Sequence, residues 1–345
     1  MTTPARAKAL VIGVARSDHP WWWKHVDREA LACDLHYWTI PLDGGRPASP
    51  FSVGFMWLVI RATRALVRAS RDGYDYIITF ENDWLTFIVA GLRTLRIVRQ
   101  PRQVIVQFIM REKTPTLNSR LKYAFMRWCF SSVHLCICSS RSEMKYYESV
   151  FEWPSTKLAF VPFHTDPVFI DAAGVPEERV IVSAGRTFRD YQTLFEAVEG
   201  TDLSVTVVAG RSSLDGAAIP RQVAMKYDVP LKELTDLIAR SMIVVLPLRE
   251  RQISTGQSVL LEAMAMGKPV VATRVNGTVD YIEHMATGLL VPPNDPQAMR
   301  NALMLLAGDV ELRHRLGNAA RREVLRQYLP NHYAQGVSRA LRGRQ

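Results

Sequence analysis

Cysteine is scarce in this chain of 345 residues, which holds only Cys33, Cys129, Cys136 and Cys138. Their spacings match no common zinc motif, so a zinc centre built on cysteine is not expected. Cys136 and Cys138 are two positions apart on an expected strand, so they point to opposite faces and do not favour a local disulfide. This use of cysteine favours a reducing compartment such as the cytosol.

Long apolar runs are also rare. The longest, residues 51–60, is too short to cross a bilayer, because a spanning helix needs about 20 apolar residues. Residues 1–8 are polar and the apolar run after them has about seven residues, which is not typical of a signal peptide. We therefore expect a cytoplasmic protein, and peripheral contact with the inner face of the membrane stays open.

Motifs for common cofactors and catalytic groups are missing as well. The first apolar strand, expected at residues 9–14, is not followed by G-x-G-x-x-G, so a dinucleotide cofactor is not indicated. No Ser/His/Asp set stands out, and no Asp-x-Asp pair follows a strand to hold a metal ion. We therefore expect no cofactor and no metal site.

Positive charge, by contrast, is abundant. The formal net charge is +10, and from Arg61 to Arg127 thirteen Lys and Arg stand against five Asp and Glu. A solvated basic face, attraction to anionic lipid and nucleic-acid binding are three interpretations of this excess. No nucleic-acid motif or basic–aromatic platform accompanies the charges, so nucleic acid is not an expected partner.

Residues 117–130 predict an amphipathic helix within this basic region. It carries Arg120, Lys122 and Arg127 together with aromatic side chains. Such a helix can rest on a membrane surface, or it can pack on the core with a basic outer face. The sequence leaves both interpretations open.

The most informative pattern begins at Ser254. Ser254 and Thr255 can cap a helix, Gly256 leaves the backbone approachable, and an apolar helical run over 259–266 is expected to end at Gly267. A helix start of this kind presents free N–H groups and the positive end of the helix dipole. This suits a phosphate or a diphosphate.

A strand, a turn and a second helix are expected after this helix. Residues 270–273 form a β-branched strand, Asn276-Gly277 is a turn signal, and the second helix should precede a strand at 288–291. Glu262 lies two helical turns after the polar loop and can reach hydroxyl groups on a ligand bound there. The alternative for Glu262 is an exposed helix charge.

Two segments, LLEAMAMGKPVVAT at 260–273 and TGLLVPPNDP at 287–296, resemble the donor-nucleotide segment of the GT-B glycosyltransferases, most closely the retaining family 4. The resemblance is dense over 254–300 and weaker over 180–300. It implies an α/β protein with two Rossmann-like domains facing a cleft and a C-terminal helix that crosses back to the first domain.

The length and the hydrophobic content of 48% also suit two domains. We expect an N-terminal acceptor-binding domain at 1–165, a linker at 166–179, a donor-binding domain at 180–328 and a crossover helix at 329–345.

The resemblance also assigns residues to the donor. In the family a Gly-Arg pair and a second cation bind the diphosphate, one Glu binds the ribose hydroxyls, and an acidic residue eight positions before it contacts the sugar. Glu262 matches the ribose-binding position, whereas Ser254 occupies the position of the other acid. The expected donor-binding residues are Gly185, Arg186, Arg189, Ser254, Thr255, Gly256, Gln257, Ser258, Val259 and Glu262.

Three residues are expected to bind the acceptor. Gly13 ends the first strand, where an open α/β domain places its ligand crevice. Trp21 belongs to a run of three Trp, which can stack on an acceptor or simply pack. His164 lies where the family has its hinge segment.

Catalytic candidates follow two further strands. Glu81 and Asp83 come directly after the strand at 75–80 and are expected to bind the acceptor or act as a general base. The alternative is that Asp83 caps the next helix. Arg111 lies near the position of a family His and can meet a phosphate or an anionic acceptor.

The resemblance implies transfer of a hexosyl group from a nucleoside diphosphate sugar, as co-substrate, to an acceptor hydroxyl with retention and without a metal. The leaving phosphate oxygen can itself take the acceptor proton. The acceptor alcohol is a lipid-linked glycan or a small metabolite, and an anionic membrane surface is a further expected partner. The alternatives are a nucleotide-sugar epimerase or sugar phosphorylase on the same fold, or a non-catalytic nucleotide-sugar-binding subunit.

Overall fold

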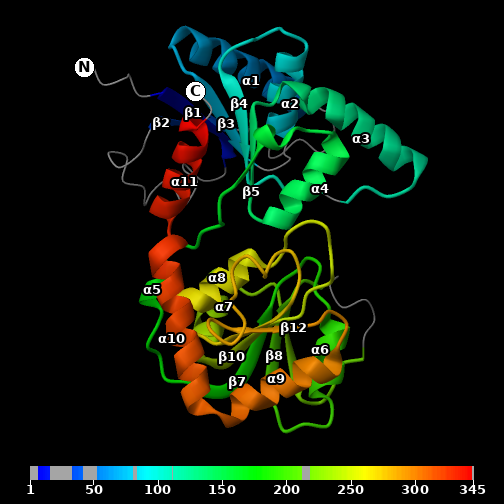
Figure 1. Cartoon of the computed structure of the whole chain (residues 1–345), viewed down its shortest axis with the longest axis vertical. Helices are drawn as coiled ribbons and strands as arrows, with labels where there is room; N and C mark the ends of the chain where they lie inside the picture. The colour runs from blue at the N-terminus through cyan, green and yellow to red at the C-terminus, as the bar shows by residue number, and fades with distance from the viewer. Residues whose placement is uncertain are drawn as a thin grey trace. The chain divides into compact units, whose positions relative to one another are not determined.

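The computed structural model describes residues 7–15, 33–41, 53–80, 84–110, 112–211 and 218–343. The chain divides into two compact units, Met1–Pro162 with Pro330–Gln345 and Phe163–Leu329. Each unit holds one six-stranded sheet with helices on its faces, and all strand pairs are parallel (Figure 1). The expected class, an α/β protein with two Rossmann-like sheets, is confirmed.

The sheet of the first unit has the strand order β2-β1-β3-β4-β5-β6. Its strands are β1 (Ala7–Ala15), β2 (Cys33–Pro41), β3 (Tyr76–Phe80), β4 (Arg102–Val106), β5 (Leu135–Cys138) and β6 (Leu158–Phe160). The central strands are buried along almost their whole length, as both-face burial in a parallel sheet requires.

Helices cover both faces of this sheet. On one face lie α1 (Val53–Arg71), α2 (Trp84–Thr94), α3 (Leu117–Cys129) and α4 (Arg141–Phe151). The last helix, α11 (Pro330–Arg342), packs on the opposite face, where Tyr333 and Val337 contact the core formed by Val11 and Ile78 (Figure 1). The C-terminal segment therefore belongs to the core of the first unit.

The sheet of the second unit has the order β12-β11-β10-β7-β8-β9. Its strands are β7 (Glu178–Ala184), β8 (Val205–Ala209), β9 (Val223–Tyr227), β10 (Ser241–Leu246), β11 (Val270–Thr273) and β12 (Leu289–Val291). The chain builds outward from β7 in one direction and then returns to place β10 on its other side. The strand order reverses between β7 and β10, which is where open α/β sheets bind ligands.

The helices of the second unit also form two layers. One layer contains α6 (Tyr191–Val198) and α9 (Pro296–Gly308), and the other contains α5 (Val168–Asp171), α7 (Leu231–Arg240) and α8 (Gln257–Ala265). The first half of α10 (Val310–Gln327) packs with the first layer and its second half with the other. Asp190, Asp295 and Asp309 cap α6, α9 and α10 through their side chains. Within the described ranges, no helix is long and apolar enough to cross a bilayer.

The strand expected at 270–273 is confirmed. The second helix expected after Asn276-Gly277 is wrong, because hydrogen bonds from Thr278 and Tyr281 close successive turns instead. Strand β9 was not foreseen. The expected linker at 166–179 falls inside the second unit, where it contains α5 and the start of β7.

Candidate functional site

The loops that follow β7 and β10 lie side by side at the C-terminal edge of the second sheet. The amide of Asp190 donates to the carbonyl of Pro247 at 2.9 Å, and the amide of Arg249 donates to the carbonyl of Phe188 at 3.0 Å. The Arg251 guanidinium lies over the Phe188 ring, 5.2 Å from its centroid. These contacts bring the loops together where the strand order reverses.

Gly185 and Arg189 form the floor of the first loop. Gly185 has φ +139°, and a Cβ added there would lie 2.1 Å from the Arg189 guanidinium. Arg189 is 7% exposed and donates from Nε to the carbonyl of Ala184 at 2.9 Å and from Nη1 to that of Thr187 at 3.0 Å. Burial lowers the pKa of Arg189. The guanidinium therefore stabilises the loop from its buried side and does not extend into solvent.

Arg186 is presented differently from Arg189. Its side chain is 67% exposed and pairs with Asp228, which follows β9, at 3.3 Å. An exposed ion pair of this kind contributes little to stability, about 0–1 kcal/mol. Arg186 can therefore exchange Asp228 for an anionic ligand at low cost.

The loop before α8 is held by the turn at Asn276-Gly277. A Cβ added to Gly277 would lie 2.1 Å from the carbonyl oxygen of Thr255, so the two backbones touch. The Asn276 side chain donates to the carbonyls of Arg251 at 2.9 Å and Gln252 at 3.2 Å. The sequence identified this dipeptide only as a turn, because its contact with Thr255 is not visible in local sequence.

Helix α8 begins at Gln257 without a side-chain cap. Its N-cap is Gly256, with φ +89°, so the predicted capping by Ser254 and Thr255 is wrong. Ser254 is instead buried, at 1% exposed. Because the N-cap residue has no side chain to accept from them, the first-turn N–H groups of α8, from Gln257 through Val259, are donors that a ligand can use.

Gln257 adds a buried polar group to the same helix end. Its side chain is 6% exposed, and its Nε2 has no hydrogen-bond partner in the described part of the chain. Buried amide groups are normally paired. An acceptor atom supplied by a ligand would satisfy this one.

Glu262 lies two turns along α8, among buried apolar neighbours. Burial raises the pKa of its carboxyl from 4.5 to about 7, while the positive charge of Arg189 acts in the opposite direction. The carboxyl is thus poised between its neutral and ionised forms near neutral pH. Donors from a ligand hydroxyl pair would favour the ionised form.

Most predicted donor residues therefore gather at one place. Leu248 links them, since it forms a bridge with Arg189 and its side chain lies 2.9 Å from a Cβ built on Gly256. Ser258 is exposed and Val259 is partly buried on the first turn of α8. The Arg186 side chain is exposed, whereas the Arg189 side chain is buried against Gly185.

Of the site residues predicted in the first unit, Gly13 alone lies within the described ranges. Trp21, Glu81, Asp83 and Arg111 lie outside the described residues. Gly13 lies within β1, two residues before its end. No contact with an acceptor is tested for any of them.

Gln107 is a residue of interest that sequence reasoning did not single out as a site. It directly follows β4, has φ +54°, and buries an Nε2 that has no partner among the described residues. A left-handed backbone at a residue other than glycine is uncommon and is often found at functional positions. No local sequence signal announces it.

His164 is buried rather than presented to an acceptor. It is 1% exposed, its ring stacks on Phe163 with centroids 5.1 Å apart, and burial lowers its pKa well below the ordinary value. Its place in the second unit and its burial do not favour the predicted acceptor contact. Over the described ranges, no three His, Cys, Asp or Glu side chains gather as a metal site.

The surface of the first unit carries two apolar and basic helix faces. On α3, four large side chains point to solvent, namely Leu117, Leu121, Phe125 and Trp128, which are 69%, 61%, 59% and 47% exposed. The core side of α3 is formed by other residues, Tyr123 and Met126. One side of this helix therefore packs on the core, as one of the two interpretations expected, and the other side exposes an apolar stripe.

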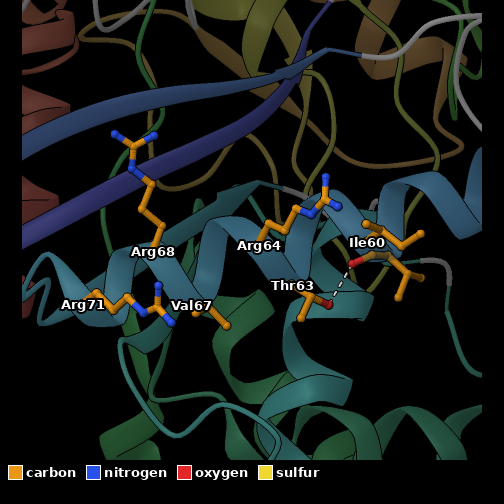
Figure 2. A pocket seen from close by; sticks show the side chains of 7 residues that line it. Ile60, Thr63, Arg64, Val67, Arg68 and Arg71 are labelled. Atoms are coloured by element: carbon orange, nitrogen blue, oxygen red, sulfur yellow. Dashed lines mark hydrogen bonds between the residues drawn. The ribbon is translucent and has the colours of Figure 1, made fainter.

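Helix α1 lines a hollow of about 580 Å³ with both apolar and basic side chains. Figure 2 shows Arg64, Arg68 and Arg71 projecting from this helix, with Ile60 and Val67 among them. Arg68 pairs with Asp72 at 3.6 Å and lies 5.0 Å from the centroid of the Trp38 ring.

The second unit is similar to parts of known proteins. Residues 179–309 match the family model described as glycosyl transferases group 1. D-rhamnosyltransferase WbpZ of Pseudomonas aeruginosa is 32% identical over 138 residues, which are 38% of this chain and 36% of that protein. The chain spans about a third or less of the length of the curated relatives it matches.

Solved structures match over the whole chain. A glycosyltransferase from Rickettsia africae gives a TM-score of 0.71 at 12% identity and covers 98% of both chains. HepE of Anabaena in complex with UDP gives 0.69 at 13% identity and covers 97% of this chain and 100% of that one; it has also been solved with UDP-glucose. Residues 179–309 thus match the group 1 glycosyl transferase model, and the chain has the two-sheet fold of the solved GT-B glycosyltransferases.

Proposed function

We propose that this protein is a retaining glycosyltransferase of the family 4 type, which transfers a hexosyl group from a nucleoside diphosphate sugar to an acceptor hydroxyl. One observation carries the proposal. An uncapped helix start at Gly256 and the carboxyl of Glu262 follow β10, and the exposed cation Arg186 follows β7, so they come after the two strands between which the strand order of the second sheet reverses.

The donor diphosphate would bind at the start of α8. The N–H groups of the first turn and the guanidinium of Arg186 would neutralise its charge, with Arg186 leaving Asp228 to do so. Ser254, Thr255 and Gly256 would line the approach. The buried amide of Gln257, whose Nε2 has no partner among the described residues, would donate to an oxygen of the ligand.

The ribose hydroxyls would donate to Glu262. A carboxyl whose pKa is near 7 becomes ionised when it accepts two hydroxyl hydrogen bonds, because these stabilise the charged form. The positive charge of Arg189 also favours the ionised carboxyl of Glu262. Its role in this proposal is to fix the loop and the Glu262 charge, while Arg186 contacts the phosphate.

Transfer with retention would place the acceptor hydroxyl on the same face of the sugar as the leaving diphosphate. The C1–oxygen bond to the diphosphate breaks, the acceptor oxygen forms the new bond, and the acceptor proton moves to the leaving phosphate oxygen. Arg186 and the helix start would stabilise the negative charge that develops there, as a metal ion does in other enzymes. We propose a metal-independent reaction on this basis.

The acceptor side is proposed from the first unit. Gly13, Trp21, Glu81, Asp83 and Arg111 keep the roles expected from sequence. The HepE complexes make UDP the first nucleotide to test here.

We also propose that the protein works at the anionic inner face of the cytoplasmic membrane. The exposed stripe of α3 has Arg120 and Lys122 beside it, and α3 contains no Asp or Glu. A helix with an exposed apolar side and flanking cations can bind at the interface of an anionic bilayer. This would bring a lipid-linked acceptor to the enzyme.

One observation keeps the non-catalytic alternative in view. Ser254 occupies the position of an acidic residue of the family and is buried, so this position supplies no carboxyl for a sugar. A nucleotide-sugar-binding subunit would bind the donor without consuming it. Release of the nucleotide by the purified chain, with and without a membrane extract as the source of acceptor, separates the two functions.

The proposed donor site is tested by thermal unfolding with UDP, GDP and ADP. A ligand that binds only the folded state raises Tm by mass action. We expect one nucleotide to raise the Tm of the wild type, and Arg186→Gln and Glu262→Gln to reduce the shift. Lys232→Gln, which removes one exposed cation from α7, is the matched control and should keep it. Equal shifts in all four proteins would contradict the site.

A further inference from the structure

A second basic hollow lies in the first unit, at the edge of the sheet opposite to the strand C-termini. It has a volume of about 560 Å³ and is formed where β4, β5 and β6 begin. Its cationic side chains are Arg93, Arg99, Arg102 and Lys157. The parallel strands place any ligand crevice of this sheet at their other ends, so the hollow is separate from an acceptor site.

The cations in this hollow are not neutralised. Among the eleven described residues that line it, none is Asp or Glu. None of the four cations forms an ion pair with a carboxylate within the described part of the chain. Cations without partners repel one another when they are held in one place, whereas a bound anion removes the repulsion.

Arg93 is fixed in the hollow by backbone contacts. It donates to the carbonyls of Arg99, at 3.0 Å, and Pro101. Its Nε is buried and has no hydrogen-bond partner among the described residues. Burial and the nearby charge of Arg102 lower its pKa to about 10. A guanidinium that is held rigidly and keeps an unused donor is a suitable anion ligand.

Lys157 approaches from the opposite side of the hollow. Its Nζ donates one of its three protons to the carbonyl of Ser131 at 2.7 Å, so two protons remain for other acceptors. Ser131 and Thr156 add hydroxyl groups to the lining. Three separate chain segments therefore contribute donors, and the oxygens of a phosphate group match donors arranged in this way.

We propose that this hollow binds a phosphate group, carried by a soluble phosphorylated molecule or by a phospholipid headgroup. The segment from Arg93 to Arg99 also exposes Leu95 and Ile97, which are 58% and 59% exposed. The lipid source would give these apolar side chains a partner, while the soluble source would leave them in water. The proposal does not depend on the function of the donor site.

Inorganic phosphate is the first probe, titrated against the full chain at constant ionic strength set with sodium chloride. We expect phosphate to raise Tm more than chloride does. Arg102→Gln and Lys157→Gln should each weaken phosphate binding about tenfold or more, because each removes a charged hydrogen-bond donor. The Arg102 side chain makes no hydrogen bond with the described residues, so its loss should leave the fold intact.

Two controls identify the site. Lys232→Gln removes an exposed cation of the second unit, and Arg186→Gln removes the cation proposed to bind the donor diphosphate. Both should keep the phosphate response of the hollow. A response that Arg186→Gln abolishes and Arg102→Gln leaves intact would place the phosphate at the donor site and overturn the proposal.

Vesicles distinguish the two sources. Phosphatidylcholine vesicles with and without phosphatidic acid are sedimented with wild type and with Arg102→Gln. Selective loss of binding to the phosphatidic acid vesicles in the variant supports a lipid headgroup, and unchanged sedimentation with a lost phosphate response supports a soluble ligand. If neither phosphate nor phosphatidic acid depends on Arg102 and Lys157, the proposal is wrong.

Discussion

The backbone of Gly277 lies directly against the backbone of Thr255, so that a Cβ at position 277 would come within 2.1 Å of the Thr255 oxygen and 2.6 Å of its nitrogen. Two segments more than twenty residues apart are thereby packed without any side chain between them. The shape of the loop that opens α8 depends on this contact, and the proposed diphosphate site depends on the loop.

Gly277→Ala should therefore displace the loop. We expect a loss of stability of about 1–3 kcal/mol from overpacking, together with a weaker response to nucleotide. Urea denaturation and nucleotide-dependent Tm shifts measure the two effects. Gly308→Ala is the matched control, because no atom lies within 4 Å of its added Cβ; it should change stability by less than about 1 kcal/mol. Equal behaviour of the two variants would show that the contact does not shape the site.

Removal of Arg186 should weaken nucleotide binding without unfolding the protein. Arg186→Gln loses a charged hydrogen bond to phosphate, which corresponds to about 1.5–3 kcal/mol, or a tenfold or greater rise in Kd. Stability should change by less than about 1 kcal/mol, because the pair with Asp228 is exposed. Isothermal titration calorimetry gives the Kd, and Asp228→Asn should leave it unchanged or lower it. A higher Kd in Asp228→Asn would mean that Asp228, too, serves the ligand.

The raised pKa of Glu262 predicts a pH-dependent stability. The folded protein holds the carboxyl proton up to about pH 7, whereas the unfolded chain releases it near 4.5. The unfolded state thus binds fewer protons between these values, so stability is greatest below pH 4.5 for this group and falls as the pH rises to about 7. Partial exposure reduces the effect to on the order of 2 kcal/mol. Urea denaturation between pH 5 and 8 should show a smaller decline in Glu262→Gln; equal slopes would mean that the carboxyl titrates normally.

The same group predicts the pH dependence of nucleotide affinity. If the ribose hydroxyls donate to the ionised carboxyl, affinity should rise as the pH increases through about 7 and level off above it. Glu262→Gln should bind more weakly and lose this rise. Calorimetric titrations at pH 6 and pH 8 compare the two proteins. An affinity that falls with pH in the wild type would contradict the proposed ionised acceptor.

The exposed stripe on α3 predicts binding to anionic vesicles. Phe125→Ser and Trp128→Ser should reduce sedimentation with such vesicles and leave stability within about 0.5 kcal/mol of wild type, because both side chains already face solvent. Leu231→Ser, at an exposed apolar position of the second unit, is the control and should sediment like wild type. A change to the oligomeric state in the α3 variants, with unchanged vesicle binding, would instead indicate contact between two copies of the chain.

The sequence was informative where a feature depends on neighbouring residues. The strand at 270–273 and the left-handed Gly267 after α8 follow from local pattern and were foreseen. The position of Glu262 on α8 follows from helical spacing in the same way.

Features that depend on distant contacts were not foreseen. Gly277 looks like an ordinary turn residue until Thr255 is placed against it. Arg189 was expected to bind the donor, yet its guanidinium donates to the carbonyls of Ala184 and Thr187. The left-handed backbone of Gln107 is likewise imposed by the surroundings of β4 and has no local signature.

The most direct test of the account is a crystal structure of the protein with the nucleotide that raises Tm most. We predict density for the diphosphate at the start of α8 within hydrogen-bond distance of Arg186, and ribose hydroxyls on the carboxyl of Glu262. Nucleotide bound elsewhere on the chain, with Arg186 still paired to Asp228 and nothing at the α8 start, would contradict the proposed donor site.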